Sequence, residues 1–170
     1  MPEPASPFSG LEWAAVNDEF RHRTSLDVRF RDIDAFGHVN NAVFSTFAEQ
    51  ARVEYLLDII GMPDGIERLP LILARLEIDY RSPITLGEHV VVESRVDRIG
   101  HSSIGIRHRI LAGEQRLAAD VRSVLVTYDY AAATPIPVPD EWRERIAAHE
   151  GRAFPAQTDA SQPLPAGSPA

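Results

Sequence analysis

Two different spacings of apolar residues lie on either side of one short acidic segment. Over about residues 25–31, apolar and charged residues alternate, which predicts a half-buried strand. Over about residues 41–60, apolar residues recur at helical spacing, which predicts a helix with one apolar stripe. Asn40 or Asn41 can cap this helix, and Gly61 can end it. The acidic segment therefore joins a strand to the N-terminus of a long helix.

Strand-like alternation fills most of the chain between Leu69 and Tyr130. Four strands are expected there, separated by turns at Gly87, Gly100 and Gly113. Turns of hairpin length force neighbouring strands to run antiparallel. Because the long helix must bury its apolar stripe, the sheet has to cover it. We therefore expect an α+β fold in which an antiparallel sheet of about five strands wraps around one long central helix.

Composition divides the chain into four parts. Residues 1–23 form an N-terminal extension that begins rich in Pro and Ser and contains one short predicted helix. Residues 24–130 carry the long helix and the sheet. Residues 131–150 hold a proline-rich stretch and a short helix that Asp140 can cap. Residues 151–170 are rich in Pro, Ala, Ser and Gln, and we expect this tail to be disordered.

Charge and composition exclude several classes of protein. The chain has a formal net charge of −8 and no cysteine, and all 17 of its Lys or Arg residues are arginine. The acidic balance disfavours nucleic acid as a partner, and the missing cysteine and lysine exclude disulfides, a thiolate zinc site and a Schiff base. The histidines show no metal-ligand spacing, so no metal is expected. With no secretory signal and no apolar run long enough to span a membrane, we expect a cytoplasmic protein.

The acidic segment carries the clearest candidate chemistry. Asp34 lies a few residues before Asn40 and Asn41, where the long helix begins. Helix N-termini present free backbone N–H groups and a partial positive charge. A carboxylate beside such donors can attack a carbonyl that they polarise, or activate water against it. The alternative is that Asp34 only stabilises the turn, which is a common role of aspartate.

The same residues resemble those of a known family. The pattern D-x-D-x-x-G-H-V-N-N at residues 32–41, followed by E-x-x-R-x-E-Y-L at residues 49–56, resembles the hotdog-fold acyl-CoA thioesterases, in particular the 4-hydroxybenzoyl-CoA thioesterase-like group. The resemblance extends over about residues 24–130 and includes Y-x-x-P-x-x-x-G at residues 80–87. It departs at Phe44, where the family usually has tyrosine.

This resemblance implies hydrolysis of an acyl-CoA to a carboxylic acid and free coenzyme A. It implies Asp34 as the nucleophile or general base. A backbone N–H of Asn40 or Asn41 is then the natural oxyanion donor, and the Asn40 side chain can orient water. His38 belongs to the motif, and a structural or substrate-lining role is favoured over that of a general base. Coenzyme A is part of the substrate, so no separate cofactor is expected.

Two further pairings are expected from the residues themselves. Asp32 is expected to pair with a nearby arginine rather than to act in catalysis. Glu49 and Arg52 are three positions apart on the long helix, which predicts an ion pair on its surface. A minor alternative is that Glu49 reaches the site as a second carboxylate.

A basic cluster after the third predicted strand is the candidate site for the coenzyme A phosphates. An acidic protein needs a local basic patch to hold the 3′-phosphate and diphosphate of coenzyme A. The resembling enzymes bind the nucleotide near this turn, often across a subunit boundary. The alternative is a solvated strand face balanced by Glu93 and Asp97. The cluster comprises Arg98, His101, Ser102 and Ser103, with Arg107 and Arg109 beside them.

Other functions fit the same pattern. An acyl-ACP thioesterase differs only in the carrier of the acyl group, and a non-catalytic acyl-CoA-binding hotdog protein would bind the ligand without releasing thiol. A hotdog dehydratase is disfavoured because its usual Asp and His arrangement on the helix is absent. An unpaired edge strand and a broad sheet face predict self-association into a homodimer or homotetramer. Neither nucleic acid nor a membrane is an expected partner.

Overall fold

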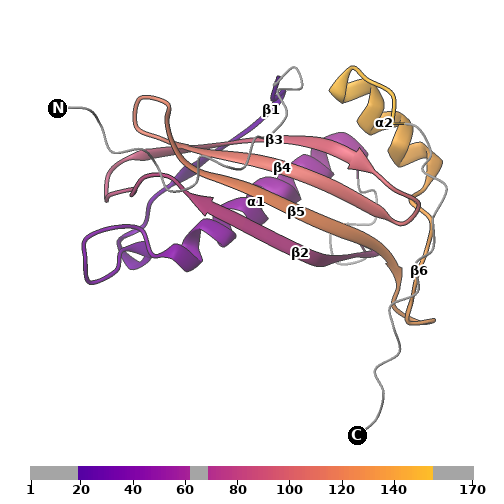
Figure 1. Cartoon of the computed structure of the whole chain (residues 1–170), viewed down its shortest axis with the longest axis horizontal. Helices are drawn as coiled ribbons and strands as arrows, with labels where there is room; N and C mark the ends of the chain where they lie inside the picture. The colour runs from indigo at the N-terminus through magenta and orange to yellow at the C-terminus, as the bar shows by residue number, and fades with distance from the viewer. Residues whose placement is uncertain (1–18, 62–68, 155–170) are drawn as a thin grey trace, which may run out of the picture.

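One long helix lies against one face of a curved antiparallel sheet (Figure 1). The computed structural model describes residues 19–61 and 69–154. Its helices are α1 (Asn41–Ile60) and α2 (Asp140–Glu150), and a short 3₁₀ turn, η1 (Phe30–Asp32), precedes α1. Its strands are β1 (His22–Asp27), β2 (Leu71–Tyr80), β3 (His89–Ile99), β4 (Ser103–Ala112), β5 (Arg116–Asp129) and β6 (Thr134–Pro135). The main strands lie in the order β1-β3-β4-β5-β2, with β6 paired to β5, and the fold is the predicted one.

Helix α1 begins and ends where the sequence predicts. Asn40 is its N-cap, and the Asn40 side chain accepts a hydrogen bond of 2.9 Å from the backbone N–H of Ala42. Gly61 ends it with a φ of 70°, a backbone conformation that favours glycine. Its buried stripe consists of Phe44, Phe47, Ala48, Ala51, Arg52, Tyr55, Leu56 and Ile60.

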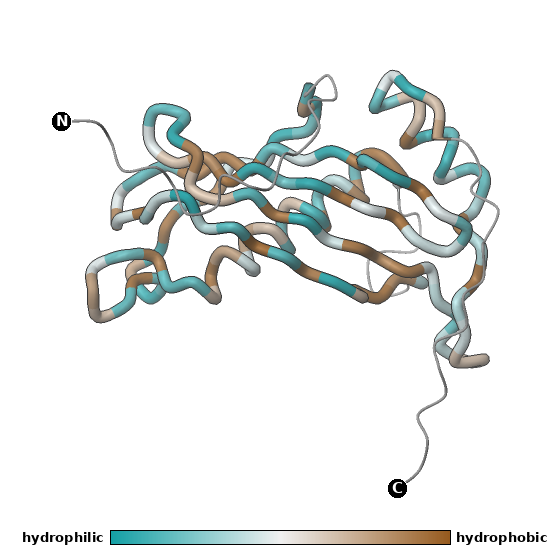
Figure 2. Tube along the Cα trace, in the orientation of Figure 1, coloured by the Kyte–Doolittle hydropathy of each residue, from teal (hydrophilic) through white to brown (hydrophobic). Residues whose placement is uncertain are grey.

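The core lies between this stripe and the sheet. Hydrophilic and hydrophobic positions alternate along the strands, as Figure 2 shows. One cluster of buried side chains surrounds the N-terminal half of α1 and includes Phe44, Ile84 and Val92. A second surrounds its C-terminal half and includes Tyr55 from α1 and Ile146 from α2. Each such apolar side chain contributes about 1.5–3 kcal/mol by leaving water.

The first strand ends earlier than its alternation predicts. Its last paired residue, Asp27, lies opposite His89, and the chain then leaves the sheet. The Asp32 carboxylate accepts hydrogen bonds from the Arg29 backbone N–H at 2.8 Å and from its side chain at 3.0 Å, which closes η1. Phe30 is 84% exposed in this turn instead of sharing a buried strand face. The prediction of a strand through residue 31 was therefore wrong, because local side-chain pairing replaced the ladder.

Four other sequence expectations have different outcomes. The prediction of a surface ion pair between Glu49 and Arg52 was wrong. Arg52 is only 6% exposed and forms no ion pair among the described residues. Asp140 is the first residue of α2 rather than its cap, which is Pro139. Most of the N-terminal extension and of the C-terminal tail lies outside the described residues, so the helix and the disorder expected there stay predictions.

Helix α2 is held against the C-terminal half of α1 by buried polar contacts. The Tyr55 hydroxyl donates to Glu150 Oε1 at 2.5 Å, and the backbone N–H of Val96 donates to the same oxygen at 2.8 Å. Burial and the charge of Glu150 raise the pKa of Tyr55, so its proton stays in place at any ordinary pH. The Arg145 side chain donates to the Ile60 carbonyl at the end of α1. These contacts close the C-terminal end of the long helix.

Candidate active site

The acidic segment forms a tight hairpin directly before α1. Ile33 lies opposite Val39, and the Asp34 N–H donates to the His38 carbonyl at 2.8 Å. Gly37 lies in the turn with a φ of 80°, in the left-handed region, and its N–H donates to the Asp34 carbonyl at 3.1 Å. The chain thus reverses within a few residues and holds Asp34 beside the helix N-terminus.

Asp32 fixes this hairpin and does not face the cleft. Its side chain is buried and pairs with the Arg29 guanidinium at 3.0 Å, which confirms the expected pairing with an arginine. Hydrogen bonds from Arg29 hold the pKa of Asp32 below its usual range. The Asp32 carbonyl also accepts a 2.8 Å hydrogen bond from the backbone N–H of Asn40. Asp32 therefore positions the residue that caps α1.

The Asp34 carboxylate has one oxygen engaged and one available. Oδ1 accepts backbone hydrogen bonds from Phe36 at 2.8 Å and from His38 at 3.3 Å. Oδ2 has no hydrogen-bond partner among the described residues. The side chain is half-buried at the edge of a cleft. The carboxylate is therefore held by the loop while its second oxygen can meet a bound molecule.

The cleft has a volume of about 310 Å³ and lies where the hairpin, the first turn of α1 and the end of β2 meet. His38 and Asn41 line it together with Asp34, so three of the predicted site residues share one surface. Phe44 forms its apolar wall. The complete lining is Asp34, His38, Val39, Asn41, Phe44, Tyr80, Arg81, Ser82 and Pro83.

The hydrogen bonds of the first turn distinguish the two candidate oxyanion donors. The N–H of Asn40 is engaged by the Asp32 carbonyl, and that of Ala42 by the Asn40 side chain at 2.9 Å. The N–H of Val43 donates to the Asn40 carbonyl at 2.8 Å. The N–H of Asn41 has no partner among the described residues, and Asn41 lines the cleft. The Asn41 amide is therefore the donor available to a bound molecule.

Tyr80 is a member of the cleft that the sequence did not indicate as a site residue. Its ring stands edge-on to Phe44, with ring centroids 5.2 Å apart. Its hydroxyl donates to the Asn41 carbonyl at 3.1 Å, and the side chain is 45% exposed. Because Phe44 lacks the phenol that the family usually has, the sequence could have indicated that another tyrosine lies near this position. Tyr80 was missed because it is 39 residues away from its hydrogen-bond partner Asn41 in the sequence.

Comparison with protein families now identifies the chain. Residues 28–146 match the model described as the thioesterase-like superfamily, and this range contains the hairpin, α1, the cleft and the whole sheet from β2 to β5. The chain belongs to the thioesterase-like superfamily. It is a hotdog-fold thioesterase, as the motif at residues 32–41 predicted.

Individual relatives of this thioesterase agree with the family match. An acyl-acyl carrier protein thioesterase of Arabidopsis thaliana, ATL3, is 28% identical over 142 residues, which are 82% of this chain and 74% of that protein. The long-chain acyl-CoA thioesterase FadM of Escherichia coli is 25% identical over 130 residues, which are 73% of this chain and 96% of that protein. A Thermus thermophilus thioesterase solved with coenzyme A and Zn is 42% identical, with a TM-score of 0.73, covering 81% of this chain and 99% of that one.

The basic cluster predicted to hold the nucleotide lies far from the cleft of this thioesterase. Arg98 lies near the end of β3, His101 and Ser102 form the turn into β4, and Ser103 is the first residue of β4. Strand β3 has 11 residues, which span about 33 Å, and its other end lies beside the hairpin. In Figure 1 the hairpin is at the left and this turn at the right. One chain therefore does not bring the predicted catalytic and nucleotide-binding residues together.

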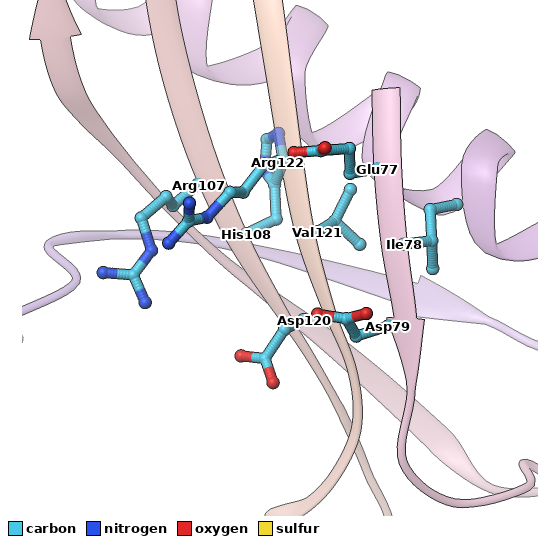
Figure 3. A pocket seen from close by; sticks show the side chains of 8 residues that line it. All are labelled: Glu77, Ile78, Asp79, Arg107, His108, Asp120, Val121 and Arg122. Atoms are coloured by element: carbon cyan, nitrogen blue, oxygen red, sulfur yellow. The ribbon is translucent and has the colours of Figure 1, made fainter. Parts of the chain in front are cut away.

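A second hollow, of about 410 Å³, lies on the face of the sheet away from α1. Figure 3 shows Arg107 next to Arg122, and Asp79 next to Asp120, and each pair lies directly opposite across neighbouring strands. Burial and the charge of Arg107 lower the pKa of Arg122. Its lining comes from strands β2, β4 and β5 and includes no helix N-terminus, so the smaller cleft fits the chemistry of a thioesterase better.

The described residues also bear on metals and membranes. Within residues 19–61 and 69–154, no three His, Asp or Glu side chains lie together in a way that could hold a metal ion. Neither helix in that part of the chain is long and apolar enough to cross a membrane. The expectation that the enzyme needs no metal and no cofactor stays a prediction.

Proposed function

We propose that this thioesterase hydrolyses an acyl-CoA to a carboxylic acid and free coenzyme A in the cleft around Asp34. The observation that supports this best is the pairing of one available carboxylate oxygen with one available helix amide, that of Asn41, on the same cleft. FadM, one of the relatives, is named a long-chain acyl-CoA thioesterase, and the Thermus thermophilus relative was solved with coenzyme A.

The chemistry follows from these two groups. The thioester carbonyl oxygen accepts a hydrogen bond from the Asn41 N–H, and the partial positive charge of the helix N-terminus stabilises the negative charge that develops there. Asp34 Oδ2 then either attacks the carbonyl carbon or takes a proton from a water that attacks it. Attack by Asp34 expels the thiolate and leaves an anhydride, which water opens to release the acid. Activation of water gives the acid and thiol directly.

Acyl-ACP is the second candidate substrate, because the Arabidopsis thaliana relative is named an acyl-acyl carrier protein thioesterase. Both carriers present the acyl group on the same phosphopantetheine arm, so the cleft chemistry is the same. Turnover of one acyl group on coenzyme A and on a carrier protein, measured side by side, separates these two functions. A non-catalytic acyl-CoA-binding protein would raise its melting temperature with ligand and release no thiol.

We further propose that the enzyme works as a homodimer joined through β2. This strand is an edge of the sheet, and its Leu73 side chain is 45% exposed. Antiparallel pairing of two β2 strands about a two-fold axis reverses the direction of the second sheet. The partner's turn around His101 would then lie at the same end of the assembly as Asp34. A dimer in solution, and weaker coenzyme A binding when Arg98 is changed to Ala, would support this arrangement.

The direct test of the proposed chemistry is Asp34→Asn. An asparagine side chain keeps the oxygen that accepts from Phe36 and His38, so the hairpin should stay folded. A thiol-detecting dye and a panel of acyl-CoAs should show a fall in kcat of about 10²–10⁴-fold. Asp129→Asn is the matched control, since Asp129, the last residue of β5, accepts from the backbone N–H of Ala131 at 2.8 Å outside the cleft. Wild-type turnover by a folded Asp34→Asn enzyme would contradict the role of Asp34.

A further inference from the structure

The hydroxyl of Tyr80 lines the cleft, and its hydrogen bond fixes the direction of its proton. Its hydroxyl lies 3.1 Å from the Asn41 carbonyl, and a carbonyl can only accept, so the phenol proton points to that oxygen. Edge-on packing against Phe44 fixes the ring, while the side chain remains 45% exposed. The lone pairs of the phenol oxygen are therefore the part of Tyr80 that can meet a ligand. They form a hydrogen-bond acceptor beside the residue whose N–H is the available donor.

We propose that Tyr80 is a substrate-positioning residue whose hydroxyl oxygen accepts a hydrogen bond from the first amide N–H of the thioester's carrier arm. The inference rests on the proposed function, because that function places the thioester carbonyl at the Asn41 N–H. In a phosphopantetheine thioester, this amide lies two methylene groups from the sulfur, and it carries the arm's nearest N–H donor. Acceptance of that N–H fixes the sulfur and the carbonyl relative to Asp34.

The proposal assigns Tyr80 a chemical selectivity. A cleft with an acceptor at this place favours thioesters of β-amidoethanethiols, the class that includes both coenzyme A and carrier-protein thioesters. A thioester with an ester oxygen in place of the amide N–H has nearly the same shape but cannot donate. Its oxygen lone pairs would instead face those of Tyr80. The enzyme should therefore distinguish the two compounds by about 3- to 10-fold, the range of one hydrogen bond.

The test compares two small thioesters of the same acyl group. One is the N-acetylcysteamine thioester, and the other is its isostere made from 2-mercaptoethyl acetate, in which oxygen replaces the N–H. The ratio of kcat/KM for the two is measured for the wild type and for Tyr80→Phe. A thioester that turns over too slowly is measured as a competitive inhibitor of acyl-CoA hydrolysis, which gives the same ratio. We expect the wild type to prefer the amide by about 3- to 10-fold and Tyr80→Phe to lose this preference.

Ser45→Ala is the control. The Ser45 hydroxyl also donates to a main-chain carbonyl of the first turn of α1, that of Ala42 at 2.6 Å, but Ser45 does not line the cleft. This variant should keep the wild-type ratio. If the Tyr80 hydroxyl only held the helix in place, Tyr80→Phe would slow both thioesters equally and leave the ratio unchanged, which would overturn the inference alone. Failure of the wild type to release thiol from any acyl-CoA or cysteamine thioester would overturn the proposed function and the inference with it.

Discussion

A tyrosine hydroxyl lies at each end of helix α1, but the two hydroxyls have opposite surroundings. At the C-terminal end, Tyr55 is 0% exposed and donates to the buried carboxylate of Glu150. At the N-terminal end, Tyr80 is 45% exposed and donates to a main-chain carbonyl, that of Asn41, beside an open cleft. The C-terminal end satisfies its polar groups within the chain, whereas the N-terminal end leaves a donor and an acceptor facing the cleft.

This difference separates stability from function along one element. A buried hydroxyl paired with a carboxylate is costly to disturb, because either partner left alone in the core pays the cost of its lost hydration. An exposed donor or acceptor costs little in the free enzyme, since water can bind it until substrate does. Substitutions at the closed C-terminal end should therefore change the free energy of unfolding, and those at the open N-terminal end should change turnover.

The largest expected effect is at the closed end. Glu150→Ala leaves the Tyr55 hydroxyl and the Val96 N–H without their shared acceptor. We expect the free energy of unfolding to fall by about 2–4 kcal/mol, while kcat of the folded enzyme at low temperature stays unchanged. Denaturant unfolding monitored by circular dichroism measures this. Glu144→Ala, at an exposed position of the same helix, is the control and should change stability little. A Glu150→Ala enzyme as stable as the wild type would remove the distinction between the two ends.

The second effect is a pH dependence that belongs to the buried sheet beneath the middle of α1. His108 is fully buried, its ring nitrogen Nδ1 lies 2.8 Å from the Ser94 hydroxyl, and burial lowers its pKa from 6.5 to about 3, with smaller effects of the Arg52 and His22 charges. Between these two pH values the unfolded chain binds a proton that the folded chain does not. Stability should therefore be lost as the pH falls from 6.5 towards 3, by about 1.4 kcal/mol per pH unit.

Substitution of His108 should remove that part of the slope. His108→Asn keeps an amide group near the place of Nδ1, which can pair with the Ser94 hydroxyl as donor or acceptor, but it has no proton to bind in this range. The free energy of unfolding, measured at several pH values between 7 and 4, should fall less steeply for the variant than for the wild type. The carboxylates of the protein contribute equally to both slopes and cancel in the difference. Equal slopes would mean that His108 is already protonated in the folded chain.

The sequence predicted local features of both ends of α1 and missed what joins them to the rest of the molecule. Asn40 and Gly61 mark the helix bounds because capping and helix termination depend on neighbouring residues. The Tyr55–Glu150 contact joins residues 95 positions apart, and no local pattern reports it. Tyr80 reaches Asn41 only because β2 lies at the edge of the sheet next to the helix N-terminus.

The distance of the basic cluster around His101 from Asp34 and the burial of Arg52 are two other features that the sequence did not predict. His101 and its neighbours form a basic group in the sequence, but β3 carries that turn to the far end of the sheet from Asp34. Helical spacing alone placed Arg52 beside Glu49 on the surface. The position on the helix was predicted correctly, but which flank of α1 the sheet buries depends on how the sheet curves around it.

A smaller effect is expected from the N-cap at the open end. Asn40→Ala removes the acceptor for the Ala42 N–H and should lower the free energy of unfolding by about 1 kcal/mol. The first turn then holds the Asn41 N–H less firmly, so kcat should fall by about tenfold. Asn40→Asp keeps a side-chain acceptor at the cap and should retain both stability and most of the turnover. Stopped assays of thiol release at saturating substrate measure the change. An Asn40→Ala enzyme with wild-type kcat would show that the cap does not position the site.

Arg52 lies midway between the two ends of α1. Its substitution should have the smallest effect, and the result shows which end Arg52 belongs with. It is 6% exposed, burial lowers its pKa, and its Nη1 atom has no hydrogen-bond partner among the described residues. A guanidinium in that state costs free energy that an apolar side chain of similar length does not. Arg52→Met should therefore raise the free energy of unfolding by up to about 1 kcal/mol and leave kcat/KM for acyl-CoA unchanged. Gln50→Met, at an exposed position of the same helix, is the control and should change both quantities little. If Arg52→Met is more stable than the wild type but has a lower kcat/KM, Arg52 serves the substrate and belongs functionally with the open end. If Arg52→Met is less stable than the wild type, Arg52 stabilises the fold, as the residues of the closed end do.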